Sequence, residues 1–298
     1  MAKVFLTNAT GYIGKAVAKA ALAKGHEVTA LARSTESVEK LEANGIKAFR
    51  GDIKQPENYI DAVRQADIVI HTAATNDADF GKFDTLTVDS IIDALKGTNT
   101  TFIYTSGTWV LGDTGEEIVN EQTAYAPLPI VTWRVDNEKK VVAAAQLGIK
   151  SVVIRPVIVY GENAGIIHNL FQQAEKSDRV NYIGSGENHW SLVHIDDLAD
   201  LYLLAIEKAQ PGSLYNASTE YITAKEIAEH IAKAAGNAQA KSQTIDEARQ
   251  TLLIFADAFA LNQKVESIKA KTELGWQPKA PKFAQDIAKA KSLTAGRI

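Results

Sequence analysis

The residues best placed to do chemistry begin near the N-terminus, in the segment TNATGYIG at positions 7–14. Gly11 and Gly14 follow the apolar run 4–6 and precede a helical pattern that ends near Gly25. Glycines between a strand and a helix N-terminus leave backbone N–H groups unpaired and let an anion approach closely. A glycine pair alone can serve helix packing, but this position in a βαβ unit favours a site for the pyrophosphate of a dinucleotide.

Asn8 occupies the position where a third glycine would complete the phosphate loop. Asparagine tolerates a positive φ better than most other residues, so we expect the turn to survive with the amide close by. The residues expected around the phosphates are Thr7, Asn8, Ala9, Thr10, Gly11, Tyr12, Ile13 and Gly14.

The end of the second expected strand indicates which dinucleotide is bound. A carboxylate there would hold the ribose 2′-hydroxyl of NAD, but the strand ends Leu-Ala-Arg33-Ser34, and the nearest acid is Glu36. The guanidinium of Arg33 can face a 2′-phosphate, and Ser34 can donate to it. The sequence therefore predicts NADP, with NAD possible. The alternative is that Arg33 is only a solvated surface residue.

Short apolar runs alternate with helical patterns over the first half of the chain, which predicts an α/β fold with a doubly wound parallel sheet, the Rossmann arrangement. In such sheets ligands bind at the carboxyl ends of the strands. The expected strands are 4–6, 28–31, 47–50, 68–70, 102–104, 152–154 and 214–217. The expected helices between them include 57–65, 84–96 and 132–147.

The pattern loosens after residue 156 and predicts a smaller, mostly helical substrate-binding part. We expect a dinucleotide-binding domain at 1–160, to which 188–220 returns, and a smaller part at 161–298. Asp196 is expected to cap a helix through Leu204, and Thr223 with Glu226 forms a capping box. One helix is expected to carry the apolar residues of 252–259. Since no linker rich in proline, glycine or serine separates the parts, they should pack together around a cleft.

These segments resemble the extended short-chain dehydrogenases/reductases, the group of sugar epimerases and dehydratases. The resemblance covers nearly the whole chain and rests on the glycine loop and on 51–53, 71–74, 104–107, 155–161, 190–197 and 274–278. It implies that Asp52 and Ile53 contact adenine and that Ala73 and Ala74 lie beside the cofactor. It also implies cofactor contacts for Thr105 and Ser106 at the active-site strand end and for Pro156 over the nicotinamide.

The catalytic pair of that family is a tyrosine followed four residues later by a lysine, whose charge lowers the tyrosine pKa. Trp133 and Asn137 fall where the pair belongs. An indole donates no phenolic proton and an amide carries no charge, so the chain resembles the atypical branch that lacks the pair. Gly107 takes the usual serine position, with Ser106 and Thr108 as hydroxyl neighbours.

Tyr125, in the loop before this helix, is a candidate substitute acid, although a loop tyrosine more often packs or lies on the surface. The catalytic candidates are thus Ser106, Thr108 and Tyr125. Arg134 and Glu138 are four residues apart on one expected helix and are expected to form an ion pair.

Composition excludes several classes of protein. The 298 residues are 46% hydrophobic and 23% charged, with a net charge of −4 and no cysteine. No block of like charge favours nucleic acid or an anionic membrane, and no stretch is apolar enough to span a bilayer. The six histidines do not cluster at metal-ligand spacing. We therefore expect a cytoplasmic monomer or homodimer, without a metal, that binds a small-molecule substrate.

Two hypotheses remain open at this point. The first is an NADP-dependent oxidoreductase or epimerase/dehydratase-like enzyme with a non-standard active site, acting on a small carbonyl or hydroxyl compound. The second is a non-catalytic protein that binds the nicotinamide cofactor and acts as a redox sensor or regulator. The missing tyrosine and lysine motivate the second hypothesis.

Overall fold

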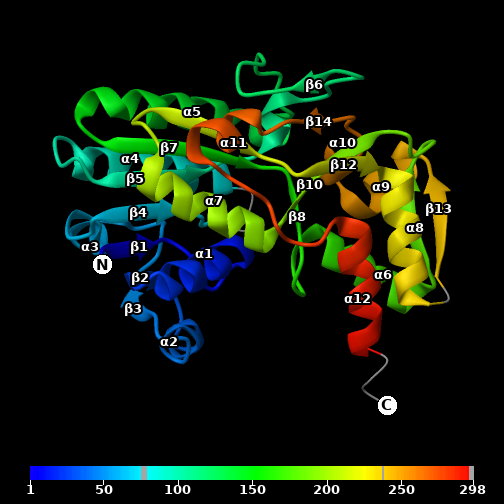
Figure 1. The fold of residues 1–298 in the computed structure, drawn as a ribbon, viewed down its shortest axis with the longest axis horizontal. Helices are drawn as coiled ribbons and strands as arrows, with labels where there is room; N and C mark the ends of the chain where they lie inside the picture. The colour runs from blue at the N-terminus through cyan, green and yellow to red at the C-terminus, as the bar shows by residue number, and fades with distance from the viewer. Residues whose placement is uncertain (75–78, 237, 295–298) are drawn as a thin grey trace.

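The structure is a computed structural model that describes residues 1–74, 79–236 and 238–294, with side chains to residue 289. Within these residues seven parallel strands form the central sheet in the order β11-β7-β5-β4-β1-β2-β3 (Figure 1). The strands are β1 Lys3–Leu6, β2 Glu27–Ala32, β3 Lys47–Arg50, β4 Ile68–His71, β5 Thr101–Thr105, β7 Lys150–Pro156 and β11 Ser213–Ala217. Each contains or overlaps a run expected from the sequence, so the predicted Rossmann-type sheet is confirmed.

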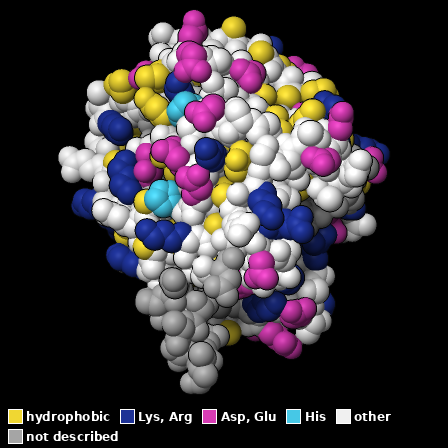
Figure 2. All heavy atoms as spheres, turned by 90° about the vertical axis from the view of Figure 1, so that its right-hand side faces the viewer, with side chains coloured by type: hydrophobic (Ala, Val, Ile, Leu, Met, Phe, Trp, Pro, Cys, Tyr) yellow, Lys and Arg dark blue, Asp and Glu magenta, His cyan; other side chains and the backbone are white. Residues whose placement is uncertain are grey.

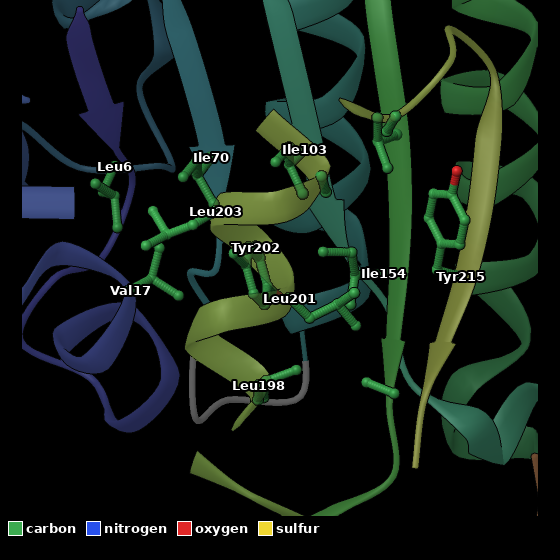
Figure 3. Packing of buried hydrophobic residues seen from close by; sticks show 14 of the residues in the cluster. Leu6, Val17, Ile70, Ile103, Ile154, Leu198, Leu201, Tyr202, Leu203 and Tyr215 are labelled. Atoms are coloured by element: carbon green, nitrogen blue, oxygen red, sulfur yellow. The ribbon is translucent and has the colours of Figure 1, made fainter. Parts of the chain in front are cut away.

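Helices cover both faces of this sheet, so the inner residues of its central strands β1, β4 and β5 are buried and mostly apolar. Alternate residues face opposite sides, so Leu6 belongs to one core and Phe5 to the other. Figure 3 shows Leu6, Ile70, Ile103 and Ile154 of the sheet packing against side chains of the helices on the first face. That face carries α1 Tyr12–Ala23, α7 Ile195–Lys208 and α11 Ile268–Leu274, and the second carries α3 Ile60–Arg64, α4 Phe80–Leu95 and α5 Thr132–Ala143.

The strand order changes direction between β1 and β4, and the segments that follow the strands meet at one edge of the sheet. Helix α2 Thr35–Glu42 follows β2 there. Short 3-10 turns lie at Pro56–Asn58, Thr108–Leu111, Pro129–Val131 and Ala144–Leu147. The loops after β1, β2, β4, β5 and β7 are therefore neighbours, as a ligand site at a topological switch point requires.

A smaller part lies beside this edge, at the right of Figure 1. Its core gathers residues of α6 Gly165–Ser177, α8 Ala224–Ala235 and α12 Phe283–Thr294. Its strands are β8 Ile158–Tyr160, β10 His189–His194 and β12 Glu220–Thr223 in one sheet, and β9 Arg179–Ile183 with β13 Gln239–Gln243 in another. A short pair, β6 Ile118–Val119 with β14 Lys264–Val265, forms a separate sheet next to β10, where the Val265 N–H donates to Ser191 Oγ at 2.8 Å. Figure 2 shows acidic and basic side chains interspersed on the outer face of this part.

The structure tests three expectations about helix ends. Thr223 and Glu226 do form a capping box before α8. The expected cap at Asp196 is wrong, because His194 caps α7 and its Nδ1 accepts from the Asp196 N–H at 3.1 Å. The single helix expected over 252–259 is also wrong. Leu253, at φ +52°, separates α9 Ile245–Leu252 from α10 Phe255–Phe259.

Among the described residues, no helix is long and apolar enough to cross a membrane.

Candidate functional site

The glycine loop makes a tight turn onto the N-terminus of α1. A Cβ added to Gly14 would lie 1.6 Å from the Asn8 carbonyl oxygen, so no side chain fits there. Helix α1 begins at Tyr12, and no side chain caps its N-terminus. Its first N–H groups are consequently left for an anion, as a pyrophosphate site requires.

Asn8 is accommodated for a reason that differs from the expected one. It is not among the described non-glycine residues with positive φ, which are Asn99, Glu162, Asp178 and Leu253. Its side chain folds into the loop instead, where Oδ1 accepts from the Gly11 N–H at 2.9 Å and from the Thr10 hydroxyl at 3.2 Å. Asparagine therefore replaces the glycine by closing a local side-chain turn.

Replacing Asn8 with glycine should leave the affinity for NADP(H) unchanged or slightly tighter, because the Gly11 N–H becomes free to donate to a phosphate. The dissociation constant from a fluorescence or calorimetric titration measures this. The control is Asn8→Asp, which keeps the acceptor oxygen but adds a negative charge beside the phosphates and should weaken binding. A tenfold loss of affinity in Asn8→Gly, about 1.4 kcal/mol, would show that the amide itself binds the cofactor.

A hollow of about 80 Å³ joins the glycine loop to the end of β2. It brings together seven of the predicted cofactor residues: Thr7, Asn8, Thr10, Arg33, Ile53, Ala73 and Ala74. Arg33 thus lies beside the glycine loop, at the position where we expect a 2′-phosphate contact. Ala9, Gly11 and Gly14 shape the loop through their backbone and do not line this hollow.

Two residues predicted to contact the cofactor in this region accept hydrogen bonds from the protein backbone. Ser34 caps α2, and its Oγ accepts from the Ser37 N–H at 3.1 Å. Asp52 accepts from the Lys54 N–H at 3.0 Å and does not line the hollow. Ser37 lines it instead and was missed. The spacing of Ser34 and Ser37 in the sequence could have indicated this, because a serine that caps a helix lies next to the residue three positions later.

A cleft of about 1220 Å³ lies between the carboxyl edge of the sheet and the smaller part. The predicted residues that line it are Tyr12, Ile13, Ala74, Ser106, Thr108 and Pro156. Helix α5 and the turn before it add Ile130, Trp133 and Arg134. Because Ala74 lines both hollows, a dinucleotide bound along the glycine loop can reach from one into the other.

The hydroxyl groups at the end of β5 have different partners. The Thr105 hydroxyl pairs with that of Tyr202 at 2.6 Å, and the Thr108 hydroxyl donates to Gln263 at 3.4 Å. Ser106 Oγ is buried and has no hydrogen-bond partner among the described residues. A buried hydroxyl without a partner costs free energy, so Ser106, unlike Thr105 and Thr108, carries a hydroxyl that no described residue satisfies.

The geometry does not support Tyr125 as the substitute acid. Tyr125 is not part of the cleft lining, and its hydroxyl donates to Glu138 Oε2 at 2.9 Å. Burial, together with the negative charge of Glu138, raises the pKa of the Tyr125 phenol to about 12. A general acid works best with a pKa near the working pH, and this shift goes the other way.

Helix α5 turns only one of the two expected positions toward the cleft. Trp133 lines the cleft and packs edge-on against Phe80, with ring centroids 4.8 Å apart. Asn137 is wholly buried and donates to Asp84 at 2.8 Å, so the second position of the expected pair does not face the cleft. The cleft receives a cation from Arg134 instead, which donates to the Thr105 carbonyl at 3.0 Å and lies over the Trp133 ring.

The ion pair expected between Arg134 and Glu138 is also wrong. The buried carboxylate of Glu138 accepts from Arg155 of β7, with Nε to Oε1 at 2.9 Å. Arg134 lines the cleft and has no salt bridge among the described residues, although its positive charge contributes to lowering the pKa of the buried Asp84 carboxyl.

A buried polar network behind Arg134 connects α5 to the glycine loop. Asp84 lies within hydrogen-bond distance of His71 (3.1 Å) and accepts from the Tyr104 hydroxyl and the Asn137 amide, each at 2.8 Å. His71 in turn pairs with the Thr7 hydroxyl at 2.8 Å. Burial alone would raise the pKa of the Asp84 carboxyl, but the charges and hydrogen bonds of its partners, His71 first, hold it below its usual value. The network fixes α5 relative to the phosphate loop.

The residues present fit a dinucleotide: an uncapped helix N-terminus, a position that excludes any side chain, and an unpaired serine in the adjoining cleft. They do not suggest a metal site, because the described residues contain no group of three potential ligands among histidine, cysteine, aspartate and glutamate.

Comparisons with known proteins agree with this geometry. The sequence profile of the "NAD dependent epimerase/dehydratase family" matches residues 4–218. An uncharacterized protein of Schizosaccharomyces pombe is 31% identical, over 96% of this chain and 98% of its own length. The 4-hydroxy-2-methyl-3-oxo-4-farnesyl-3,4-dihydroquinoline-1-oxide ketoreductase of Stigmatella aurantiaca is 25% identical, over 72% of this chain and 67% of its own. UDP-glucose 4-epimerase of Thermus thermophilus, solved with NAD, has a TM-score of 0.81 at 22% identity, over 99% of this chain and 100% of its own.

Proposed function

Because the chain belongs to the NAD-dependent epimerase/dehydratase family, we propose that it is an NADP(H)-dependent oxidoreductase acting on a small carbonyl or hydroxyl compound. The observation that carries the proposal is the pairing of Ser106 and Arg134 in one cleft beside the glycine loop. One supplies a hydroxyl without a partner and the other a permanent positive charge, which together suit a carbonyl oxygen.

The cofactor, when bound, supplies or accepts hydride. The glycine loop would hold its pyrophosphate, and Arg33 with Ser37 would hold the 2′-phosphate that distinguishes NADP from NAD. During reduction of a carbonyl, the oxygen gains negative charge, which the guanidinium of Arg134 and the hydroxyl of Ser106 stabilise. Arginine keeps its proton at neutral pH, so the proton for the product comes from the Ser106 hydroxyl or from water.

The Stigmatella aurantiaca relative supports carbonyl reduction over epimerisation, because its name describes a ketoreductase. Its similarity covers 72% of this chain. We therefore assign carbonyl reduction as the first activity to test, with the reverse oxidation of a hydroxyl compound as its counterpart.

Replacing Arg33 with alanine should remove most of a preference for NADP(H) over NAD(H), since a charge-assisted contact with phosphate contributes about 1.5–3 kcal/mol. Calorimetric titration of each cofactor measures the preference before and after the change. Arg50→Ala is the matched control: Arg50 is also exposed at a strand end, but it bonds Thr35 and does not line the hollow. Equal affinity of the unmodified protein for both cofactors would overturn the assignment of NADP.

A second candidate function is a non-catalytic redox sensor. It is favoured by the two positions of the family's catalytic pair, because Trp133 donates a hydrogen bond to the Ile130 carbonyl and Asn137 donates one to Asp84, so neither side chain replaces the tyrosine or the lysine. A sensor would bind NADP(H) with the same dependence on Arg33 but reduce no carbonyl compound. Assays of NADPH oxidation with a panel of aldehydes and ketones distinguish the two functions, because only the oxidoreductase would consume NADPH.

A further inference from the structure

The two walls of the cleft differ in chemical character. The described charged residues that line it are Asp79, Lys82 and Arg134, and all belong to α4, α5 or the residue preceding α4. The opposite wall, from the smaller part, presents Val157, Ile158, Val159, Ile166 and the segment 253–255, with no charged side chain among its described lining residues. A ligand group lying against that second wall meets only apolar side chains and backbone.

The segment 253–255 forms an apolar lip at the mouth of the cleft. Leu253, Ile254 and Phe255 are 68%, 62% and 45% exposed, three consecutive large apolar residues open to water. Burying such side chains is favourable, so a run of them beside a cleft marks a binding surface. Leu253 has φ +52° and ψ −132°, a strained backbone for a residue with a side chain.

The lip is anchored at its C-terminal end by aromatic packing. Trp109, which lines the cleft, lies with its ring centroid 6.2 Å from that of Phe255 and 6.2 Å from that of Phe259. Helix α10 is thereby tied to the turn after β5, close to Ser106 and Thr108. The lip and the proposed reaction centre therefore line the same cleft.

We propose that the substrate carries an extended apolar group, an alkyl or aryl chain, that lies against this second wall and under the lip. The inference rests on the proposed function, since the carbonyl end is the one that faces Ser106 and Arg134. A nucleoside diphosphate in the same place would set two negative phosphates against a wall whose described residues include no cation, where phosphate recognition needs arginine or lysine.

Chain length provides the test. With NADPH in excess, kcat/KM for methyl ketones from 2-butanone to 2-decanone should rise by about fourfold for each methylene group that reaches the wall, since burying one contributes about 0.8 kcal/mol. Dissociation constants with NADP⁺ present, read from tryptophan fluorescence, should fall in the same order. UDP-glucose should bind at least tenfold more weakly than 2-decanone.

Ile254→Ser is the variant, and Ile268→Ser is its matched control, because Ile268 is 55% exposed but lies outside the cleft at the start of α11. Ile254→Ser should weaken 2-decanone binding by about five- to tenfold and leave 2-butanone within twofold. Ile268→Ser should change neither value.

The outcomes separate this inference from the proposed function. Ketone reduction without dependence on chain length, or tighter binding of UDP-glucose, would overturn the apolar substrate and leave the oxidoreductase standing. Binding that strengthens with chain length, without any turnover, would support the apolar ligand and overturn the oxidoreductase. If Ile254→Ser instead converts a dimer to a monomer on size exclusion and leaves ketone binding unchanged, the lip is a protein interface and the inference is wrong.

Discussion

Glu138→Ala lowers the free energy of unfolding by about 3–5 kcal/mol, the expected cost of leaving one member of a buried ion pair without its partner. Glu138 and Arg155 have side-chain exposures of 0% and 1%, and Arg155 donates to the carboxylate from both Nε and a terminal nitrogen. Arg155 Nη1 has no hydrogen-bond partner among the described residues, and without Glu138 the truncated protein would bury the guanidinium with no compensating charge. Tyr125 would lose its acceptor as well. Urea unfolding followed by circular dichroism measures the change.

The same helix offers the control for this prediction. Lys140 pairs with Asp89 at 2.6 Å, but both side chains are more than a third exposed. A surface pair contributes about 0–1 kcal/mol, so Lys140→Ala should change the free energy of unfolding by no more than that. A loss below about 1 kcal/mol for Glu138→Ala would mean that the Arg155 charge finds water or another partner, and that the pair does not secure α5 against β7.

Arg134→Ala should lower kcat/KM for carbonyl reduction by about 10²–10³-fold, the usual cost of removing one group that stabilises a developing oxyanion. Arg134 is the charged residue that α5 turns into the cleft, and its contact with the Thr105 carbonyl places it at the end of β5, beside Ser106. Steady-state assays with NADPH and 2-decanone measure the loss.

Two further variants separate catalysis from positioning in that experiment. Arg134→Lys keeps the charge but loses the planar fork, and it should recover part of the activity. Lys139→Ala removes an exposed charge from the same helix outside the cleft and should leave kcat/KM within twofold. If Arg134→Ala reduces only the affinity for NADP(H), with kcat unchanged, Arg134 holds the cofactor and another group stabilises the oxyanion.

The sequence is sufficient to predict the layered fold and the location of the nucleotide loop. Strands buried on both faces are continuous apolar runs, and helices between them show a period of 3.6 residues, so local pattern alone identifies both. The glycine loop is equally local, because its function depends on the strand before it and the helix after it. This is why the parallel sheet is confirmed and why Thr7, Asn8, Thr10 and Arg33 line one hollow.

The tertiary structure alone decides which polar side chains face the cleft. Spacing on a helix pairs Glu138 with Arg134, but β7 brings Arg155, seventeen positions from Glu138, into its reach. In the same way α4 supplies Asp84 to Asn137, which is fifty-three positions away, and so removes Asn137 from the site. For these two side chains, burial without a partner would cost more than a local pairing on the helix surface gains. Partners supplied by distant elements are therefore the reason that Arg134, and neither Asn137 nor Tyr125, lines the cleft.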